Sequence, residues 1–221
     1  MRKINKSEPK QFKRFRQTNH QNQWDKFSNG KKKRCKDYIL NIEQKGLSSY
    51  TEMPIKQYIH LKNLVHFDHF IKQEFDELKI FDWNNLFIDI HRHAEGKTYI
   101  EDDKDFYFGA DYKDTHIETE AENQKIINPA TANPHHFFAY MCNGEMTINN
   151  NLSIDDNDCA KLTRDKAFNL NDPILKKKRE DLCDLIITDY LTLPPRKALE
   201  QVREYGFISC AEFMLDKDNL Y

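Results

Sequence analysis

Two neighbouring residues, Asp68 and His69, carry the side chains that hydrolysis of a phosphodiester bond requires. They lie in the apolar run Val65–Phe70. A neutral imidazole can take a proton from water, and a carboxylate can hold a divalent cation that stabilises the transition state. Successive side chains of a strand point to opposite faces, so a bend or a strand end is needed for both to meet one substrate. The same spacing also fits a plain hydrogen-bonded pair.

Other patterns for metal binding are less specific. Among nine histidines, His91 and His93 form a His-x-His pattern that could clasp a metal ion in an extended segment. The five cysteines are widely spaced and contain no Cys-x-x-Cys pair. This usage argues against a disulfide framework and against a cysteine-rich zinc knuckle. Asp68 and His69 therefore remain the leading candidates.

Two segments further along the chain strengthen this interpretation. Asp82-Trp83-Asn84-Asn85-Leu86 follows the pair, and Asp111-Tyr112-Lys113 comes later. The order of Asp-His, Asn-Leu and an acid closely followed by Lys resembles the ββα-metal, or HNH, nuclease motif. In that motif a hairpin presents the His, a loop Asn restrains the hairpin, and the next helix supplies a second metal ligand.

The resemblance implies a role for each matching residue. The roles are general base for His69, restraint of the hairpin for Asn85, metal binding for Asp68 and Asp111, and contact with phosphate oxygens for Lys72 and Lys113. The second metal ligand stays open at this point. Asp89, His91 and His93 compete with Asp111 for it.

Four segments then resemble a single family, in the same order. They are Gly46–Ile55 (Gly-Leu-Cys-x-Tyr-Cys-Glu-x-x-Ile in the family), Val65–Gln73 (Ile-Glu-His-Phe-x-Pro-Gln), Ile127–Gly144 (Asp-Pro, Asp-Pro, His-Phe and Gly) and Phe168–Arg179 (Leu-Asn-Leu-Asn-x-x-x-Leu-x-x-x-Arg). The chain resembles the HNH nuclease subunit of bacterial anti-phage defence systems of the Septu and retron-associated kind. The resemblance runs from about residue 1 to residue 190.

This resemblance implies a metal-dependent HNH endonuclease that hydrolyses nucleic acid with Mg²⁺ or another divalent metal. It also implies an ATPase partner of the SMC/ABC type and, in the retron branch, a reverse transcriptase with its RNA–DNA hybrid. The chain departs from the family at Ser48 and Thr51, where the family has cysteines, and no cysteine lies near Gly109-Ala110, where a second pair stands. Because hydroxyls are poor zinc ligands beside thiolates, no structural zinc is expected. Lys72 replaces the proline that follows the catalytic His.

Charge is distributed unevenly along the chain. Residues 1–36 hold thirteen Lys and Arg and two acids, whereas residues 37–221 hold 21 bases and 34 acids. A basic segment of this kind supplies affinity for nucleic-acid phosphates that does not depend on sequence. We therefore expect the run Lys31, Lys32, Lys33 and Arg34 to contact nucleic acid. The alternative is a solvated tail, or a helix whose bases pair with the acidic remainder.

Hydrophobic patterning predicts an α+β protein that is mostly helical. The resemblance implies that N- and C-terminal helices wrap a small ββα-metal centre. The expected regions are a basic arm (1–36), the nuclease region (37–120) and a helical C-terminal region (121–221). Expected elements are helices over 31–44 and 55–64, a strand over 65–70, an acidic loop over 95–122, a helix opened by Asp172-Pro173, a second opened by Pro194-Pro195, and a last one with a Ser209/Glu212 capping box.

No run of residues approaches the length of a membrane span, and the first twenty residues lack an apolar signal core. We therefore expect a cytoplasmic protein without a membrane partner. Two alternatives to the nuclease remain. One is a degenerate HNH scaffold that binds partners or nucleic acid without cutting, which the missing cysteines favour. The other is an interaction domain in which Asp68 and His69 are only a satisfied hydrogen-bonding pair.

Overall fold

The computed structural model describes residues 1–18, 24–56, 65–90, 93–94, 97–98 and 107–216. The fold is α+β and mostly helical, as predicted. Its helices are α1 (Lys10–Thr18), α2 (Asn29–Tyr38), α3 (Ala110–His116), α4 (Glu120–Lys125), α5 (Ile154–Lys161), α6 (Pro173–Leu185), α7 (Pro195–Val202) and α8 (Ile208–Leu215). In the described ranges the strands form three antiparallel pairs, β1 (Val65–His69) with β2 (Leu86–Ile90), β3 (His93–Ala94) with β4 (Lys97–Thr98), and β5 (Phe138–Tyr140) with β6 (Met146–Ile148).

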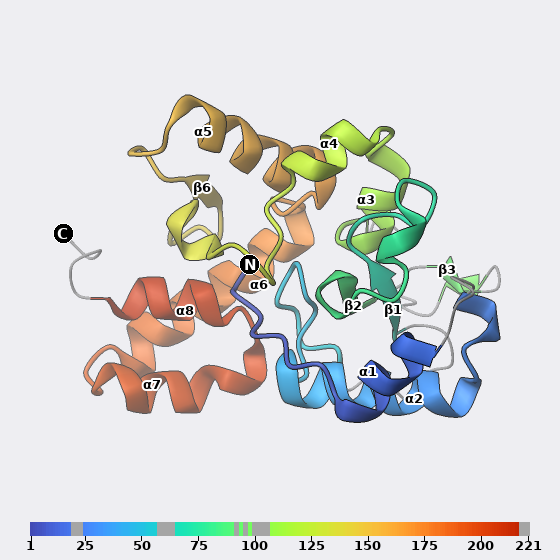
Figure 1. Cartoon of the computed structure of the whole chain (residues 1–221). Helices are drawn as coiled ribbons and strands as arrows, with labels where there is room; N and C mark the ends of the chain where they lie inside the picture. The colour runs from blue at the N-terminus through green and yellow to red at the C-terminus, as the bar shows by residue number, and fades with distance from the viewer. Residues whose placement is uncertain (19–23, 57–64, 91–92, 95–96, 99–106, 217–221) are drawn as a thin grey trace.

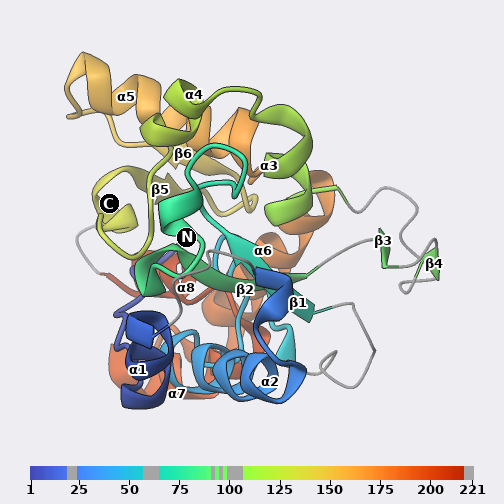
Figure 2. The ribbon, with the colours of Figure 1, turned by 45° about the vertical axis from the view of Figure 1, so that its right-hand side comes forward.

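The β1–β2 pair lies between two groups of helices, with α1 and α2 on one side and α3 and α4 on the other (Figures 1 and 2). The Lys36 ammonium of α2 donates to the Val65 carbonyl of β1 at 2.6 Å. The Ala110 amide of α3 donates to Asp89 of β2 at 3.1 Å. Both helix groups are thus fastened directly to the strands that carry the candidate site.

The described part of the basic N-terminal segment contributes side chains to the core. Met1, Ile4, Phe12 and Phe27 are buried. The predicted helix over 31–44 is present as α2 followed by a π-helical turn, Ile39–Glu43. Its predicted end at Gly46 is confirmed, since Gly46 has the left-handed φ of 84° that glycine adopts without strain. The predicted helix over 55–64 falls largely on residues 57–64, outside the described part of the chain.

Glu52 joins three distant parts of the chain. Its carboxylate pairs with the Met1 amino group at 2.8 Å and accepts from the Ser209 amide at 2.9 Å. Its carbonyl accepts from the Phe207 amide at 3.0 Å. Glu52 is 1% exposed, so these bonds satisfy a carboxylate that burial would otherwise penalise.

The C-terminal helices follow the sequence closely. The Asp172 side chain accepts from the Ile174 amide at 2.9 Å, and Pro173 is the first residue of α6, as predicted. Helix α8 differs in its start. It begins at Ile208, and Ser209 is inside it with its amide bound by Glu52, so the predicted capping box is not formed. A carboxylate from a distant loop takes the capping role there.

The prediction of a loop over 95–122 is wrong where the structure describes that segment, because it contains α3 and α4. These helices have seven and six residues, too few to show a helical period in sequence. They are stabilised by tertiary contacts instead, since Lys113 and Asn123 are fully buried. No helix in the described ranges is long and apolar enough to cross a membrane.

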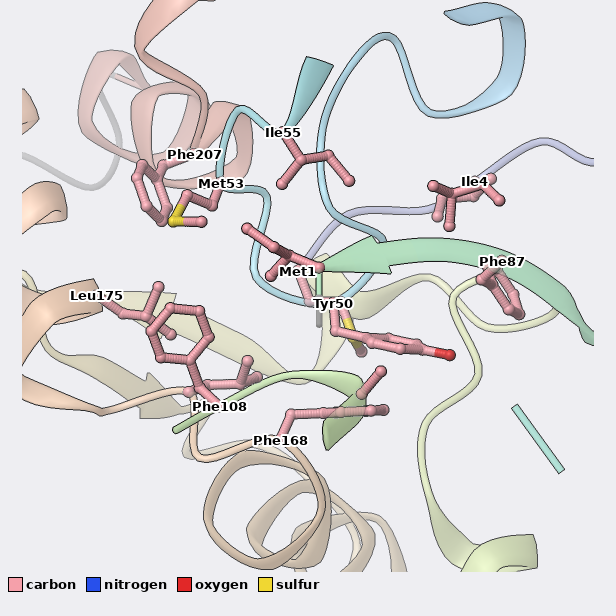
Figure 3. Packing of buried hydrophobic residues seen from close by; sticks show 14 of the residues in the cluster. Met1, Ile4, Tyr50, Met53, Ile55, Phe87, Phe108, Phe168, Leu175 and Phe207 are labelled. Atoms are coloured by element: carbon pink, nitrogen blue, oxygen red, sulfur yellow. The ribbon is translucent and has the colours of Figure 1, made fainter. Parts of the chain in front are cut away.

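The core continues beneath the strands. The Tyr50 ring stacks on Phe168, with ring centroids 4.0 Å apart and planes 15° apart. Figure 3 shows the two rings face to face, with Phe108 and Leu175 beside them. Tyr50 is thus fixed by packing, which also fixes the position of its hydroxyl.

Asp172→Ala should lower the free energy of unfolding by about 1 kcal/mol, the usual cost of losing an N-terminal cap. Urea unfolding followed by tryptophan fluorescence measures this loss. Asp184→Ala on the exposed face of the same helix is the matched control, and should change stability by less than about 0.5 kcal/mol. Equal effects of the two substitutions would contradict the capping role.

Candidate functional site

The candidate site is built where β1 ends and β2 begins. Asp68 pairs with Phe87 and His69 with Leu86 in the register of the two strands. Asn85 fastens the connection between them. Its side-chain oxygen accepts from the Ile71 amide at 2.6 Å, and its amide nitrogen donates to the carbonyls of Ile71 and Lys79, each at 3.1 Å. The loop that follows His69 therefore has a fixed path.

His69 is held in one tautomer. Its Nε2 lies 3.1 Å from the Ile80 carbonyl, and because a carbonyl only accepts, Nε2 carries the hydrogen. The lone pair is then on Nδ1, which lies 3.2 Å from the amide nitrogen of Gln73. The Trp24 ring packs edge-on against the imidazole at 4.8 Å.

Burial keeps the His69 imidazole neutral. The side chain is buried, and this desolvation lowers the pKa of His69 to about 4, against a smaller opposing effect of Asp68. His69 is thus an unprotonated base at neutral pH. Gln73, which covers Nδ1, also lines an open groove of about 380 Å³. The other lining residues are Asp68 and His69 themselves, with His66, Phe67, Lys72, Glu74 and Asp114. A ligand in this groove that displaced the Gln73 amide would face the lone pair.

Asp68 points away from His69 and is saturated by protein groups. Both of its oxygens accept from the Lys113 ammonium at 2.8 Å, and the Tyr50 hydroxyl donates to Oδ2. The same ammonium reaches the His69 carbonyl at 2.8 Å. Burial by itself would raise the pKa of Asp68, but attraction to Lys113 and the bonds from Lys113 and Tyr50 hold it below its usual value. Asp68 is thus a buried carboxylate whose charge is balanced by the Lys113 ammonium.

This arrangement does not fit a divalent metal at Asp68. Only 4% of Asp68 is exposed, and the Lys113 ammonium takes the place in which a metal would meet its oxygens. In the described ranges no three His, Cys, Asp or Glu side chains are grouped to hold a metal ion. The acid of α3 that lines the groove is Asp114, and Asp111 is not among the lining residues. The side chains of His91 and His93 lie outside the described part.

The positions at which the resembled family has cysteines lie together. Ser48 and Thr51 share a hydrogen bond of 2.8 Å between their hydroxyls. Asp89 of β2 is bonded by the Ser48 side chain and by the Ala110 amide. A Cβ placed on Gly109 would lie 2.9 Å from Asp89 and 3.7 Å from Thr51. Segments far apart in sequence thus meet in a polar cluster of Ser48, Thr51 and Asp89 against the Gly109 turn.

Asp89 is the unusual acid of this cluster. It is fully buried, and desolvation raises its pKa to about 7 against the hydrogen bonds from Ser48, Ile90 and Ala110. Its role as a competing metal ligand, considered from the sequence, would require exposure toward the groove. Asp89 instead binds the first amide of α3, which fixes the helix on the sheet.

The predicted phosphate contacts fall into two groups. Lys72 donates to the carbonyls of Asp114 and Ile117 at 2.8 and 2.6 Å. Lys113 is fully buried and donates to the His69 carbonyl. Both lysines therefore hold α3 against the end of β1. The other four, on α2, reach the surface, with Lys31, Lys33 and Arg34 exposed and Lys32 half-buried. The Lys32 ammonium lies 5.1 Å from the Trp24 ring, which itself touches His69.

Three partners of the site were missed from the sequence. They are Trp24, Tyr50 and Gln73, of which only Gln73 has a local signal, since it lies four residues after His69. The chain matches no protein-family model and no curated protein sequence. Its function is therefore inferred from the arrangement of its residues.

Proposed function

We propose that this chain is an HNH-type nuclease subunit that hydrolyses phosphodiester bonds of nucleic acid, with His69 as the general base. The observation that carries the proposal is the state of His69. Its Nε2–H is held by the Ile80 carbonyl, its pKa is about 4, and its Nδ1 lies beside Gln73 of the 380 Å³ groove. A fixed, neutral imidazole beside an open groove is what proton removal from water requires.

In the proposed reaction Nδ1 takes the proton of the attacking water, and the Ile80 carbonyl stabilises the imidazolium through Nε2–H. A base with a pKa of about 4 is weak. A phosphate entering the groove would raise that pKa, because a nearby negative charge favours the protonated imidazole. The base would thus become stronger when substrate is present.

Two further features support the nuclease. The first is the order of elements around Asp68, His69 and Asn85. The strand pair β1–β2 has a connecting loop that is held by Asn85, and helix α3 follows. The second is the contact of Ser48 and Thr51 with Asp89 and the Gly109 turn. In the resembled family these two segments carry the two cysteine pairs, and a shared fold brings them together. The resemblance further implies the SMC/ABC-type ATPase and the retron reverse transcriptase with its RNA–DNA hybrid as partners.

A non-cleaving scaffold is the second candidate, and the Asp68–Lys113 ion pair favours it. With its carboxylate bound by Lys113 and Tyr50, Asp68 has no exposed oxygen with which to recruit a metal. Dependence on Mg²⁺ or another divalent metal therefore stays a prediction. It requires Lys113 to leave Asp68.

Cleavage of single- and double-stranded DNA and RNA tests the proposal, with and without an ATPase partner, in Mg²⁺, Mn²⁺ or EDTA. His69→Ala should reduce the rate at least about a hundredfold, the lower range for loss of a general base. His136→Ala, at an exposed histidine outside the groove, is the matched control and should cleave at the wild-type rate. Identical rates for wild type and His69→Ala would remove His69 from the mechanism. Binding of nucleic acid without cleavage under every condition would support the non-cleaving scaffold instead of the nuclease.

A further inference from the structure

A second groove lies between α1 and α2, outside the groove of His69. Its volume is about 310 Å³, at the lower end of the range for ligand sites. Three rings, Phe12, Phe15 and Phe27, line it together with three cations, Arg14, Lys31 and Arg34. We call it the α1–α2 groove. Both views of the molecule show the two helices side by side (Figures 1 and 2).

The rings form a preformed aromatic surface. Phe12 and Phe27 are buried, whereas Phe15 is half-buried. Phe15 lies against Phe27 with ring centroids 4.5 Å apart, and Phe27 meets Phe12 edge-on at 5.8 Å. This packing holds Phe15 in place at the groove. A planar group can therefore stack there without first ordering the ring.

The cations around the rings select an anionic ligand. Arg14, Lys31 and Arg34 are exposed, and the Lys31 ammonium lies 4.8 Å from the Phe15 ring. Helices α1 and α2 together contain nine Lys and Arg and one acid, Asp37. The Cys35 thiol adds no charge, because burial raises its pKa to about 11.

The aromatic rings and cations of the α1–α2 groove fit a single nucleotide better than a peptide helix. A helix docked in a groove needs several anchors over two or three turns, and this groove has a volume of only about 310 Å³. A base stacks on an aromatic ring while its phosphate meets Lys or Arg, and this is available only where the base is unpaired.

We propose that the α1–α2 groove binds one nucleotide of a single-stranded nucleic acid, with its base on Phe15 and its phosphate at Lys31 and Arg34. The groove is connected to the candidate active site by side chains. Phe27 lies 5.6 Å from Trp24, and Trp24 lies 4.8 Å from His69. This inference rests on the proposed function for its ligand class.

Fluorescence anisotropy with a labelled twelve-nucleotide single strand, in DNA and RNA forms, tests the site. The His69→Ala chain in EDTA is used, so that binding is measured without cleavage. Lys31→Glu and Arg34→Glu should each weaken binding about tenfold or more. Lys13→Glu is the matched control, because Lys13 is exposed on the neighbouring helix α1 but is absent from the groove lining. It should weaken binding no more than about threefold.

Phe15→Leu keeps an apolar side chain and removes the stacking surface. It should weaken binding of the single strand about five- to tenfold, within the range measured for one stacked base. A duplex of the same sequence should bind more weakly than the single strand and should not respond to Phe15→Leu.

Three results would overturn the inference. They are equal losses for Lys13→Glu and Arg34→Glu, which indicate unspecific attraction; no binding of any oligonucleotide; and displacement of the single strand by an acidic aromatic peptide, which would make the groove a peptide site. The cleavage assay decides the nuclease separately. If the protein binds nucleic acid through the α1–α2 groove but never cleaves it, the inferred binding site is supported and the proposed nuclease function is contradicted.

Discussion

Lys113→Met should lower the free energy of unfolding by about 3–5 kcal/mol at pH 8, the usual cost of removing one partner of a buried ion pair. Methionine fills most of the volume of the lysine stem. The loss therefore comes from Asp68, whose carboxylate would keep only the Tyr50 hydroxyl as a donor. The carbonyls of His69 and Phe70, which Lys113 also contacts, lose a donor as well.

The pH dependence of this loss identifies its cause. Without Lys113, burial raises the pKa of Asp68 above the unfolded value of about 3.9. Stability from a group with a raised pKa is present below the unfolded pKa and is lost as pH rises through the folded one. The deficit of Lys113→Met should therefore be smaller at pH 5 than at pH 8.

Urea titrations at the two pH values measure the effect, with Trp24 and Trp83 as probes. Lys125→Met, at an exposed lysine of α4, is the control and should stay within about 0.5 kcal/mol of wild type. Asp68→Asn combined with Lys113→Met removes both charges and should recover much of the loss. A deficit below 1 kcal/mol, or one that does not change with pH, would show that the pair is not a buried ion pair in solution.

Asp89→Asn should make the protein less stable than wild type at pH 4 and more stable at pH 8. The folded pKa of Asp89 is about 7 and the unfolded value is about 3.9. Between these values the folded state holds a proton that the unfolded state has released. The contribution of Asp89 to the free energy of unfolding is therefore fully present below pH 4 and is lost by pH 8. The difference of about three pKa units makes this loss about 4 kcal/mol.

Asparagine cannot ionise, so the variant escapes this loss at high pH. At low pH it gives up one of the bonds that the acid accepts from Ile90 and Ala110, at a cost of about 1 kcal/mol. Unfolding curves collected in half-unit steps from pH 4 to pH 8.5 should cross. Asp216→Asn at an exposed acid serves as the control. Parallel curves for wild type and Asp89→Asn would contradict the raised pKa.

His69 has the opposite dependence. Its pKa is lowered from 6.5 to about 4, so its contribution to stability is lost as pH falls through that window. In wild type the two slopes largely cancel between pH 4 and pH 6.5. Asp89→Asn should expose the His69 slope, as a stability that declines on acidification below pH 6.5.

Local signals in the sequence were sufficient for several elements. Val65–Phe70 is apolar and β-branched at its start, and β1 covers Val65–His69. Asp172-Pro173 gives both a cap and a fixed φ, and α6 begins there. Asp68 and His69 have different partners, Lys113 and Tyr50 for Asp68 and Trp24 and Gln73 for His69, but both residues line the same groove at the end of β1.

The partners of the site could not be predicted in this way. A lysine in an acidic segment reads as an exposed cation, and the resemblance implied a phosphate contact for Lys113. Its burial depends on Asp68, which lies 45 residues earlier. Asp89 likewise reads as an exposed ligand, and becomes a buried acid only because Ser48 and Ala110 meet it from other segments.

Glu52 has a consequence for how the protein is made. Its carboxylate is buried with the amide of Ser209, 157 residues later. At the usual 5–20 residues per second of synthesis, about 8–30 s separate the two on the ribosome. During that interval the buried Glu52 carboxylate has the Met1 amino group but not the Ser209 amide as a partner, so the contacts of the loop around Glu52 stay incomplete. A ribosome-stalled chain ending before Phe207 should accordingly be far more sensitive to protease than one that exposes α8.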